Sequence, residues 1–365
     1  MNMKRLAIGI ALFLTITASV FAQSDLQPLA VVKLNKSETI TLKQLMTRAG
    51  FLEKQLAAAG ANQKLTPEQR SQLLDSLIQE KLVAQAAAKS GISVTDSEVD
   101  AAFLSTFAQQ IGQQVTEAQL SDMIKKQTGK TLNEYILESS GMSLSDYKAY
   151  LKNQLLAQRY VFTQKQADIQ KVTATDKEIR SAYDMNKSQY VWNDMVKLFL
   201  VVVPKGTDAA TAKATATDLR NQYVKNPSVE NTIKASPDNG KKYQAGNMIV
   251  QKTTDQARIL GWSYDNIEEL FSKAKGYVGE ITETKTDFQF YAVQEKYSAK
   301  MLAISDIITP ESNVTVYEYI KSVLTSQKQS QYFAQAAQDI ASSLDTPANV
   351  ERKKTGSALT SLLNW

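Results

Sequence analysis

Several of the side chains that usually perform enzymatic chemistry are missing from this chain of 365 residues. It contains no histidine and no cysteine. Catalysis by a Ser-His-Asp or Cys-His arrangement is therefore excluded, and so are disulfides and thiolate sites. The usual ligands of zinc are also absent. The groups that remain for chemistry include carboxylates, hydroxyls and basic side chains.

Two groups of acidic residues lie close together in the sequence: Asp96, Glu98 and Asp100, and Glu268 with Glu269. They could form paired carboxylates or a metal site. Solvated charge at the starts of helices is the favoured interpretation, because the helix dipole stabilises acidic side chains there. Lys241–Lys242 and Arg352–Lys354 are short basic runs, for which solvated surface is favoured over a site for anionic lipid or nucleic acid. The net charge of +5 is too weak and too spread out to indicate nucleic-acid binding.

Residues 1–22 have the pattern of a secretory signal peptide. Lys4 and Arg5 supply positive charge, Leu6 to Val20 is apolar, and Val20-Phe21-Ala22 fits a cleavage site. The apolar stretch is too short for a comfortable membrane span, and no later stretch is long enough. We therefore expect an exported protein with no membrane span after signal cleavage and no cysteine for a lipid anchor.

Most of the first half of the chain is predicted to be helical. Short strands are expected near 29–34 and 39–41, and the next helix begins near residue 42. Ser/Thr-x-x-Glu/Gln capping boxes mark later helix starts, at Thr66, Thr95, Thr116, Thr131 and Thr175. The predicted helices are 67–90, 96–111, 117–128, 132–139, 144–170 and 176–188. A last long helix is predicted over about 314–344.

Residues 195–300 predict a small domain with a strand at each end. Val196 to Pro204 is rich in β-branched and aromatic residues, which indicates a buried strand. Helices are expected over 208–224 and 228–235. In the closing strand, the alternation predicts Phe288, Phe290 and Ala292 on one face, and Tyr291 on the other.

This arrangement resembles a prolyl isomerase domain of the parvulin type. The matching features are the first strand, a Ser-x-Asp turn at Ser236, a Leu-Gly-aromatic turn at Leu260–Trp262 that follows about fifteen extra residues, and the closing strand. The resemblance places the two catalytic histidines of the family at Phe199 and Tyr291, and its Asp/Cys position near Asp238 and Asn239. The loss of both histidines predicts an inactive domain. The resemblance also implies a peptide-binding pocket made by Leu260, Trp262, Leu270, Phe271 and Phe288.

A second resemblance is specific in residues 68–100. Leu77 to Leu82 reads Leu-Ile-x-Glu-Lys-Leu, and Gly91 to Val99 reads Gly-Ile-x-Val-Thr-Asp-x-Glu-Val, which resembles the N-terminal domain of SurA-type chaperones. It implies an α+β fold, with a mostly helical chaperone domain built from both chain ends and an inserted parvulin-like domain, a small antiparallel sheet flanked by helices. The expected boundaries are 1–22 for the signal peptide, 23–190 for the helical domain, 191–300 for the parvulin-like domain and 301–365 for a returning C-terminal helix.

The function implied by these resemblances is that of a periplasmic holdase. It would bind unfolded exported proteins, such as outer-membrane protein precursors, without ATP, cofactor or metal. An active isomerase using Tyr291, Asp238 and the apolar pocket is the alternative, and an envelope-interaction protein on the same scaffold is a third. Self-association and the role of residues 357–365 stay open.

Methionines and tyrosines of the helical region, taken together, could form an adaptable client surface, although ordinary helix core is the favoured interpretation for each single residue. They are Met123, Met142, Met248, Tyr135, Tyr147, Tyr150 and Tyr160.

Overall fold

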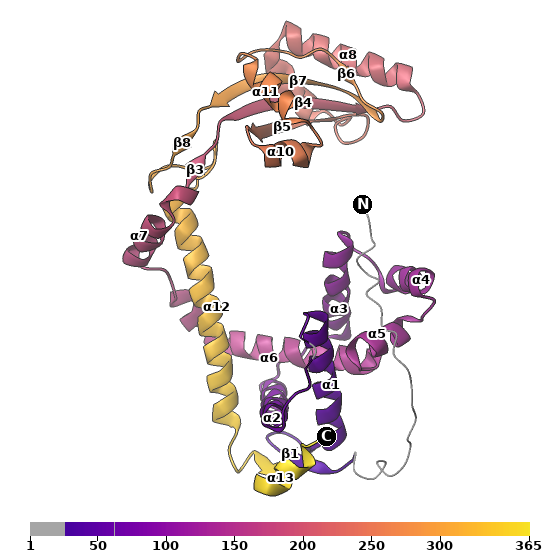
Figure 1. Cartoon of the computed structure of the whole chain (residues 1–365), viewed down its shortest axis with the longest axis vertical. Coiled ribbons are helices and arrows are strands. Elements are labelled where there is room, and N and C mark those ends of the chain that lie inside the picture. Colours follow the sequence, from indigo (N-terminus) through magenta and orange to yellow (C-terminus); the bar gives the residue numbers. More distant parts are fainter. Residues whose placement is uncertain (1–25, 62) are drawn as a thin grey trace. The chain divides into compact units, whose positions relative to one another are not determined.

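The computed structural model describes residues 26–61 and 63–365, and these form two units (Figure 1). The first unit joins the N-terminal part of the chain, up to Val172, to Gln329–Trp365. The second unit is Thr173–Lys328. The predicted signal peptide, residues 1–22, lies outside the described residues.

The helices of the first unit begin at hydroxyl-bearing N-caps. In α2 to α5 the cap is the threonine of a predicted capping box, and its hydroxyl accepts the backbone N–H three residues on. Helix α1 has a further box at Thr41, and Ser143 caps α6. The bounds are α1 Leu42–Ala58, α2 Pro67–Lys89, α3 Asp96–Ile111, α4 Glu117–Thr128, α5 Leu132–Ser140 and α6 Leu144–Lys171.

Both ends of the chain meet in a three-stranded antiparallel sheet of the first unit, in the order β2-β1-β9. Its strands are β1 Pro28–Val32, β2 Glu38–Thr41 and β9 Val350–Arg352. Strand β9 follows the long helix α12 (Val316–Leu344), in a stretch for which the sequence predicts only a break in the helical pattern. The sheet packs on a core that includes Leu29, Ile40, Ile78 and Val350. The predicted helical domain built from both chain ends is thereby confirmed.

The tail after β9 belongs to the same core. Helix α13 (Gly356–Leu362) leads to Leu363, which is 1% exposed. Arg70 of α2 is buried and donates from Nη1 to the carbonyl oxygen of Leu363 at 2.7 Å. Its guanidinium also lies 4.3 Å from the ring centroid of Trp365. The tail therefore closes over α2.

The second unit contains a four-stranded antiparallel sheet in the order β5-β4-β7-β6. Its strands are β4 Met195–Pro204, β5 Gln244–Gln251, β6 Thr282–Glu283 and β7 Asp287–Tyr297. Two helices pack on one face, α8 Ala209–Lys225 and α9 Glu230–Ala235, with a 3-10 turn at Pro227–Val229 between them. The other face carries α10 Thr254–Leu260 and α11 Tyr264–Ser272. The predicted small antiparallel sheet flanked by helices is confirmed.

The stretch expected as extra residues before Leu260 is part of this sheet. It forms β5, which pairs with β4 from Met195↔Gln251 to Val202↔Gln244, and then α10. Its sequence, Gln-Ala-Gly-Asn-Met-Ile-Val-Gln, has little of the apolar alternation that marks a strand. Pairing with β4 supplies the stabilisation that the local sequence does not indicate.

The rest of the second unit is a smaller cluster around the start of α12. Helix α7 (Asp176–Met185) and a 3-10 turn at Lys187–Gln189 precede the short pair β3 Val191–Trp192 and β8 Lys300–Met301. Ile179, Tyr183, Leu302, Val316 and Ile320 form its core. Because this core joins segments on either side of the sheet, the units divide at 172/173 and 328/329, whereas the sequence places boundaries at 190/191 and 300/301.

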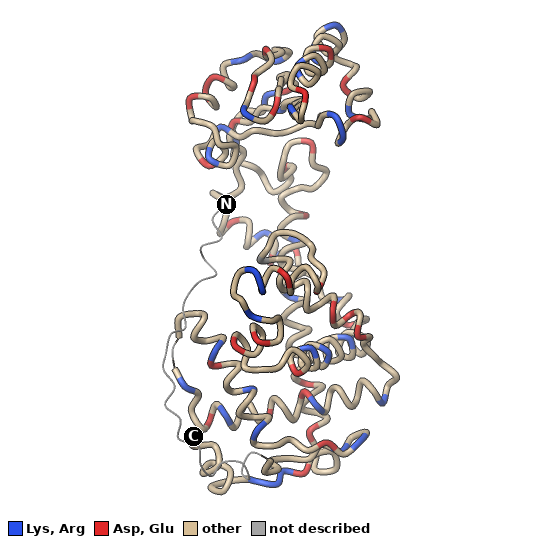
Figure 2. The backbone as a smooth tube through the Cα atoms, turned by 90° about the vertical axis from the view of Figure 1, so that its right-hand side faces the viewer, with Lys and Arg blue, Asp and Glu red and all other residues tan. Residues whose placement is uncertain are grey.

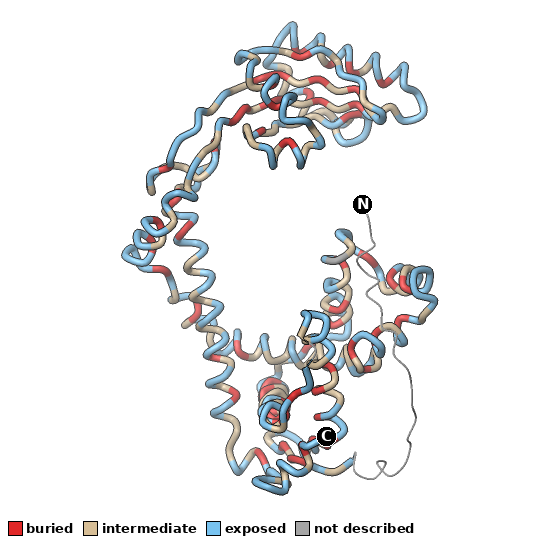
Figure 3. Tube along the Cα trace, in the orientation of Figure 1, coloured by how far each residue is buried: buried red, intermediate tan, exposed pale blue. Residues whose placement is uncertain are grey.

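Buried residues follow these elements (Figure 3). In the second unit they recur along the central strands, and in the first they occupy one side of each of several helices. The described part of the chain has no helix both long enough and apolar enough to cross a membrane.

Replacing Leu363 by alanine tests the place of the tail in the first core. We expect a loss of about 2–5 kcal/mol of stability, because a buried leucine leaves a cavity, and faster hydrogen exchange in β1 and β9. The matched control is Leu137→Ala in α5, where the leucine is 48% exposed and the cost should be within about 0.5 kcal/mol. Equal exchange rates in the two variants would show that the tail does not hold the sheet.

Candidate functional site

The central strands of the second unit present side chains to two covered faces. Strands β4 and β7 lie side by side, and alternate residues of each point to opposite faces. Phe199, Phe288 and Phe290 share a core with α8 and α9. Leu198 and Val293 share another core with α10 and α11.

Phe199, one of the two expected histidine positions, is a core residue on the α8 face. Its ring stacks on Tyr223 with centroids 5.0 Å apart, and it meets Phe290 edge-on at 6.4 Å. The side chain is 0% exposed. It carries no hydrogen-bonding group and has no open side from which a substrate could approach.

Tyr291, the other expected position, is half-buried and packs against the α10–α11 core on the opposite face. In the strand register it lies opposite Leu200, while Phe199 lies opposite Ala292. The structure therefore does not bring the two positions together. Burial raises the pKa of the Tyr291 hydroxyl, with a smaller contribution from Tyr277, so this group stays a hydrogen-bond donor at neutral pH.

Asp238 and Asn239 form part of the turn between α9 and β5. The Asp238 carboxylate pairs with Lys242 at 3.1 Å. The Asn239 amide donates to the carbonyl oxygens of Lys234 and Ala245, and its oxygen accepts the N–H of Ala245 at 2.9 Å. These bonds hold the turn against β5, and neither residue belongs to the core around Tyr291.

Four of the five predicted peptide-binding residues lie together on the Tyr291 face. Leu270 is buried in that core, and the other three are half-buried around it. Together with Tyr291 and Met248, these half-buried residues form what we call the apolar patch: Met248, Leu260, Trp262, Phe271 and Tyr291. The fifth predicted residue, Phe288, lies on the α8 face with Phe199 and does not belong to this surface.

The first unit has a groove of about 520 Å³ between β2, α1, α2 and α6. Its apolar lining is contributed by Leu26, Ile40, Leu77, Met142, Ala149 and Tyr150. Polar and charged side chains complete it, including Arg48, Glu80 and Asn153. We call this cavity the helical groove.

The central charges of the helical groove neutralise each other. Arg48 binds Glu80 with two hydrogen bonds, of 2.8 and 3.3 Å, and both side chains are less than one-fifth exposed. The Asn153 amide donates to the same carboxylate at 3.2 Å. The guanidinium lies 4.3 Å from the ring centroid of Tyr150, and burial raises the pKa of that tyrosine. The groove thus offers apolar and aromatic surface around a satisfied ion pair.

The sequence did not identify Arg48, Glu80 and Asn153 as a group, because they lie on three separate helices. Glu80 had a signal, since it is the acidic residue of the Leu-Ile-x-Glu-Lys-Leu motif. Of the seven expected methionines and tyrosines, Met142 and Tyr150 line the groove. Three others, Met123, Tyr135 and Tyr147, pack around Phe103 in the core of the first unit. Met248 does not belong to the helical region, because it lies in the second unit.

The acidic group at the start of α3 is paired with basic residues of α6. Asp96 binds Lys152 at 2.8 Å, Glu98 binds Arg159 at 2.5 Å, and Asp100 binds Lys148 at 2.8 Å. Arg159, helped by the N–H and hydroxyl of Thr95, holds the pKa of Glu98 down at about 2. These carboxylates join two helices. Among residues 26–61 and 63–365, no cluster of acidic side chains could hold a metal ion.

Residues of both basic runs also have acidic partners. Lys242 binds Asp238, and Arg352 binds Asp75 and Asp345 at 3.1 and 2.7 Å. In Figure 2, basic and acidic residues are interspersed along the backbone of both units.

Comparison with known proteins relates the chain to a chaperone family. Residues 3–106 match the family model of the SurA-like N-terminal domain. A stretch of 125 residues, 34% of the chain, is 33% identical to Chaperone SurA of Cupriavidus metallidurans. The N-terminal part of the chain is therefore similar to SurA-like proteins. The match spans 22% of the length of that relative, so it concerns one part of a longer protein.

A second relative covers more of this chain. Foldase protein PrsA of Clostridium perfringens strain 13 is 24% identical over 273 residues, which are 69% of this chain and 73% of that protein. Among solved structures, one of two SurA-like chaperones of Campylobacter jejuni aligns with 90% of this chain and 99% of its own, at 19% identity and a TM-score of 0.29. That score supports no conclusion about the arrangement of the whole chain.

The separation of Phe199 and Tyr291 can be tested with introduced cysteines, since the chain has none of its own. We expect Leu200→Cys with Tyr291→Cys to be joined rapidly by a short bifunctional thiol reagent, because these residues share a face and lie opposite each other. Phe199→Cys with Tyr291→Cys should react slowly. Intact-protein mass spectrometry reads out the cross-link. Faster joining of the second pair would contradict the register.

Proposed function

We propose that this protein is a chaperone that binds unfolded segments of exported polypeptides, without ATP and without isomerase catalysis. The observation that carries the proposal is the helical groove, which lies in the unit containing the SurA-like N-terminal domain. Support also comes from relatives that are named a chaperone and a foldase.

The lining of the helical groove suits an extended segment of varied sequence. Ile40, Leu77 and Met142 offer aliphatic contacts, and Tyr150 offers an aromatic face. Methionine and tyrosine accommodate different side chains, because one is flexible and the other amphipathic. The Arg48–Glu80 pair is already satisfied, so the groove does not demand a particular charge from its ligand.

The apolar patch of the second unit would provide a further contact for the same client. Its half-buried residues supply hydrophobic surface, and exposed apolar surface commonly marks a binding site. Within the patch, Tyr291 occupies an expected histidine position, and its hydroxyl can form hydrogen bonds. An isomerase would have to rely on that hydroxyl, because Phe199 faces the other core. Peptide binding without catalysis is therefore the proposed role of the domain.

The proposed location is the periplasm. It rests on the basic and apolar pattern of residues 1–22, which predicts export. The proposed clients are precursors of outer-membrane proteins, whose alternating apolar strands would expose side chains for the groove before they fold.

The proposal is tested by the aggregation of a denatured outer-membrane barrel protein, with the chain present or absent. Ala149 is an exposed helical residue that lines the groove. We expect Ala149→Glu to weaken suppression of aggregation several-fold, because it places a charge in an apolar cavity. The control is Ala334→Glu, at an exposed position of α12 in the same unit, which should behave like the unchanged chain.

The same sample is then added to a protein whose refolding is limited by proline isomerisation. An unchanged slow phase, together with suppressed aggregation, supports the proposed holdase. A slow phase that is accelerated, and is lost in Tyr291→Phe, would favour the isomerase. If aggregation is unaffected by the chain, or if both glutamate variants act alike, the groove is not the client site.

A further inference from the structure

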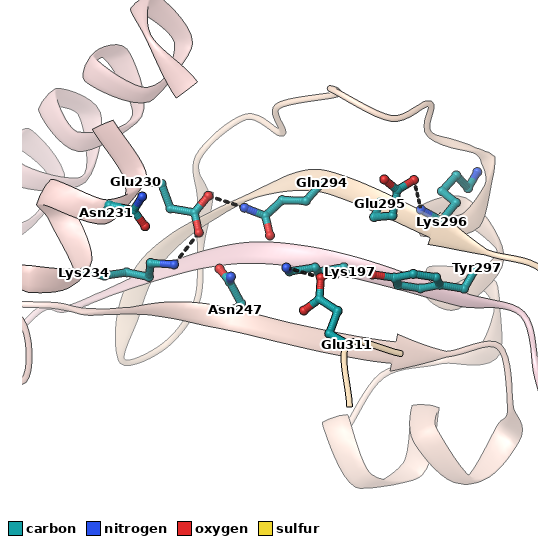
Figure 4. Close-up of a pocket in the computed structure, with 10 residues that line it drawn as sticks. All are labelled: Lys197, Glu230, Asn231, Lys234, Asn247, Gln294, Glu295, Lys296, Tyr297 and Glu311. Atoms are coloured by element: carbon teal, nitrogen blue, oxygen red, sulfur yellow. Dashed lines mark hydrogen bonds and ion pairs between the residues drawn. The ribbon is translucent and has the colours of Figure 1, made fainter. Parts of the chain in front are cut away.

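A polar cavity of about 680 Å³ lies in the second unit, beside β4 and β7 (Figure 4). Its lining comes from three strands of the sheet, from α9 and from the loop before α12. The residues are Lys197 of β4, Asn247 of β5, Gln294 to Tyr297 of β7, Glu230, Asn231 and Lys234 of α9, and Glu311. We call it the polar cavity.

Glu311 reaches the polar cavity from the loop 302–315, which precedes α12 and is folded as a short hairpin. The Ile308 N–H donates to the carbonyl oxygen of Val314 at 2.8 Å, and Ile307 forms a bridge with Thr315. Glu311 lies at the tip of this hairpin and has a φ of 64°. In the described part of the chain, it is the residue other than glycine that has a positive φ. A residue with a Cβ in this conformation costs about 1 kcal/mol or more, so some contact has to hold it.

That contact is made by the Glu311 carboxylate. Its Oε1 lies 2.5 Å from the Lys197 ammonium, and the Tyr297 hydroxyl donates to the same oxygen at 3.2 Å. The Lys197 side chain is 17% exposed, whereas that of Glu311 is 49% exposed. Lys197 lowers the pKa of Glu311, and burial together with Glu311 raises the pKa of Tyr297 to about 12. An ammonium and a phenol hydroxyl thus form a two-donor site for a carboxylate.

The other charges of the polar cavity have their own partners. Lys234 pairs with Glu230 at 2.6 Å, and Glu230 also accepts the Gln294 amide. Glu295 pairs with Lys275 at 2.5 Å.

Lys296 donates to two backbone carbonyl oxygens, those of Phe271 and Lys273. Among the described residues that line the cavity, Lys197 is therefore the cation that loses its bonded carboxylate when the loop tip moves away. A carboxylate from another molecule would restore that pair.

We propose that the polar cavity binds a carboxylate of a polypeptide, and that Glu311 occupies it as an internal competitor. The cavity is far larger than one carboxylate, and the amides of Asn231 and Asn247 line it. Side-chain amides can bond to the N–H and C=O groups of a peptide backbone. The carboxylate could come from a chain terminus or from an acidic side chain. This site is separate from the helical groove and does not depend on the proposed function.

The test is binding of three fluorescent peptides of otherwise identical neutral sequence, followed by fluorescence anisotropy. One has a free C-terminal carboxylate, one is amidated with a central glutamate, and one is amidated and neutral. We expect Glu311→Ala to bind at least one acidic peptide about tenfold more tightly than the unchanged chain, because the competitor is gone. The arm that responds identifies the source of the carboxylate, and the neutral peptide should not respond.

Two further variants make the test specific. Glu280→Ala removes another carboxylate of the second unit, one paired with Arg220 at 2.6 Å, and should leave peptide binding unchanged. Lys197→Met added to Glu311→Ala should abolish the gain. Near-ultraviolet circular dichroism checks that each variant is folded, and Glu311→Gln replaces Glu311→Ala if that variant is not. No gain on removing the Glu311 charge, or a gain that survives Lys197→Met, would overturn the proposal.

Discussion

The alternation of side chains along β4 and β7 is the constraint on which the second unit depends. Both strands are covered on two faces, so each must supply apolar residues to two cores at once. This explains the nearly continuous apolar run of β4. It also decides which residues can act together, because two positions on neighbouring strands meet only when they share a face. Phe199 and Tyr291 do not, and the α8 face is closed by aromatic packing around Phe199.

A comparable constraint shapes the first unit, where the pairing is between distant parts of the chain. Strand β1 bonds to β2 on one side and to β9 on the other. The N–H of Lys353 also donates to the carbonyl oxygen of Leu29 at 2.8 Å. Since such contacts close a loop of more than 300 residues, they cannot form until the C-terminal segment is present. The helical groove includes β2 of this sheet, so its wall rests on a contact between the chain ends.

The sequence predicts the elements that depend on contacts between nearby residues better than those that depend on contacts between distant residues. Helix starts are local, and a threonine three residues before Glu or Gln marks those of α2, α3, α4, α5 and α7. Strands β5 and β9 depend on pairing with distant strands, and their own sequences carry little signal. The site shows the same division. Leu260, Trp262, Leu270 and Phe271 were predicted because the family resemblance implies a pocket there. The face of Phe288 and the Arg48–Glu80 pair instead depend on strand register and helix packing, which the local sequence does not indicate.

The Arg48–Glu80 and Lys197–Glu311 ion pairs differ in the free energy that their separation would cost. Arg48 and Glu80 are both less than one-fifth exposed, lie on two packed helices and share two hydrogen bonds. Separating them would leave a charge in a low-dielectric environment, which is strongly unfavourable. In the pair of Lys197 and Glu311, only the lysine is comparably buried. Glu311 is half exposed at a loop tip, so when it leaves, its carboxylate regains water and its backbone is freed from the left-handed conformation. These two gains offset part of the lost attraction. The Arg48–Glu80 pair is therefore a rigid support, whereas the Lys197–Glu311 pair is a contact that another carboxylate can replace.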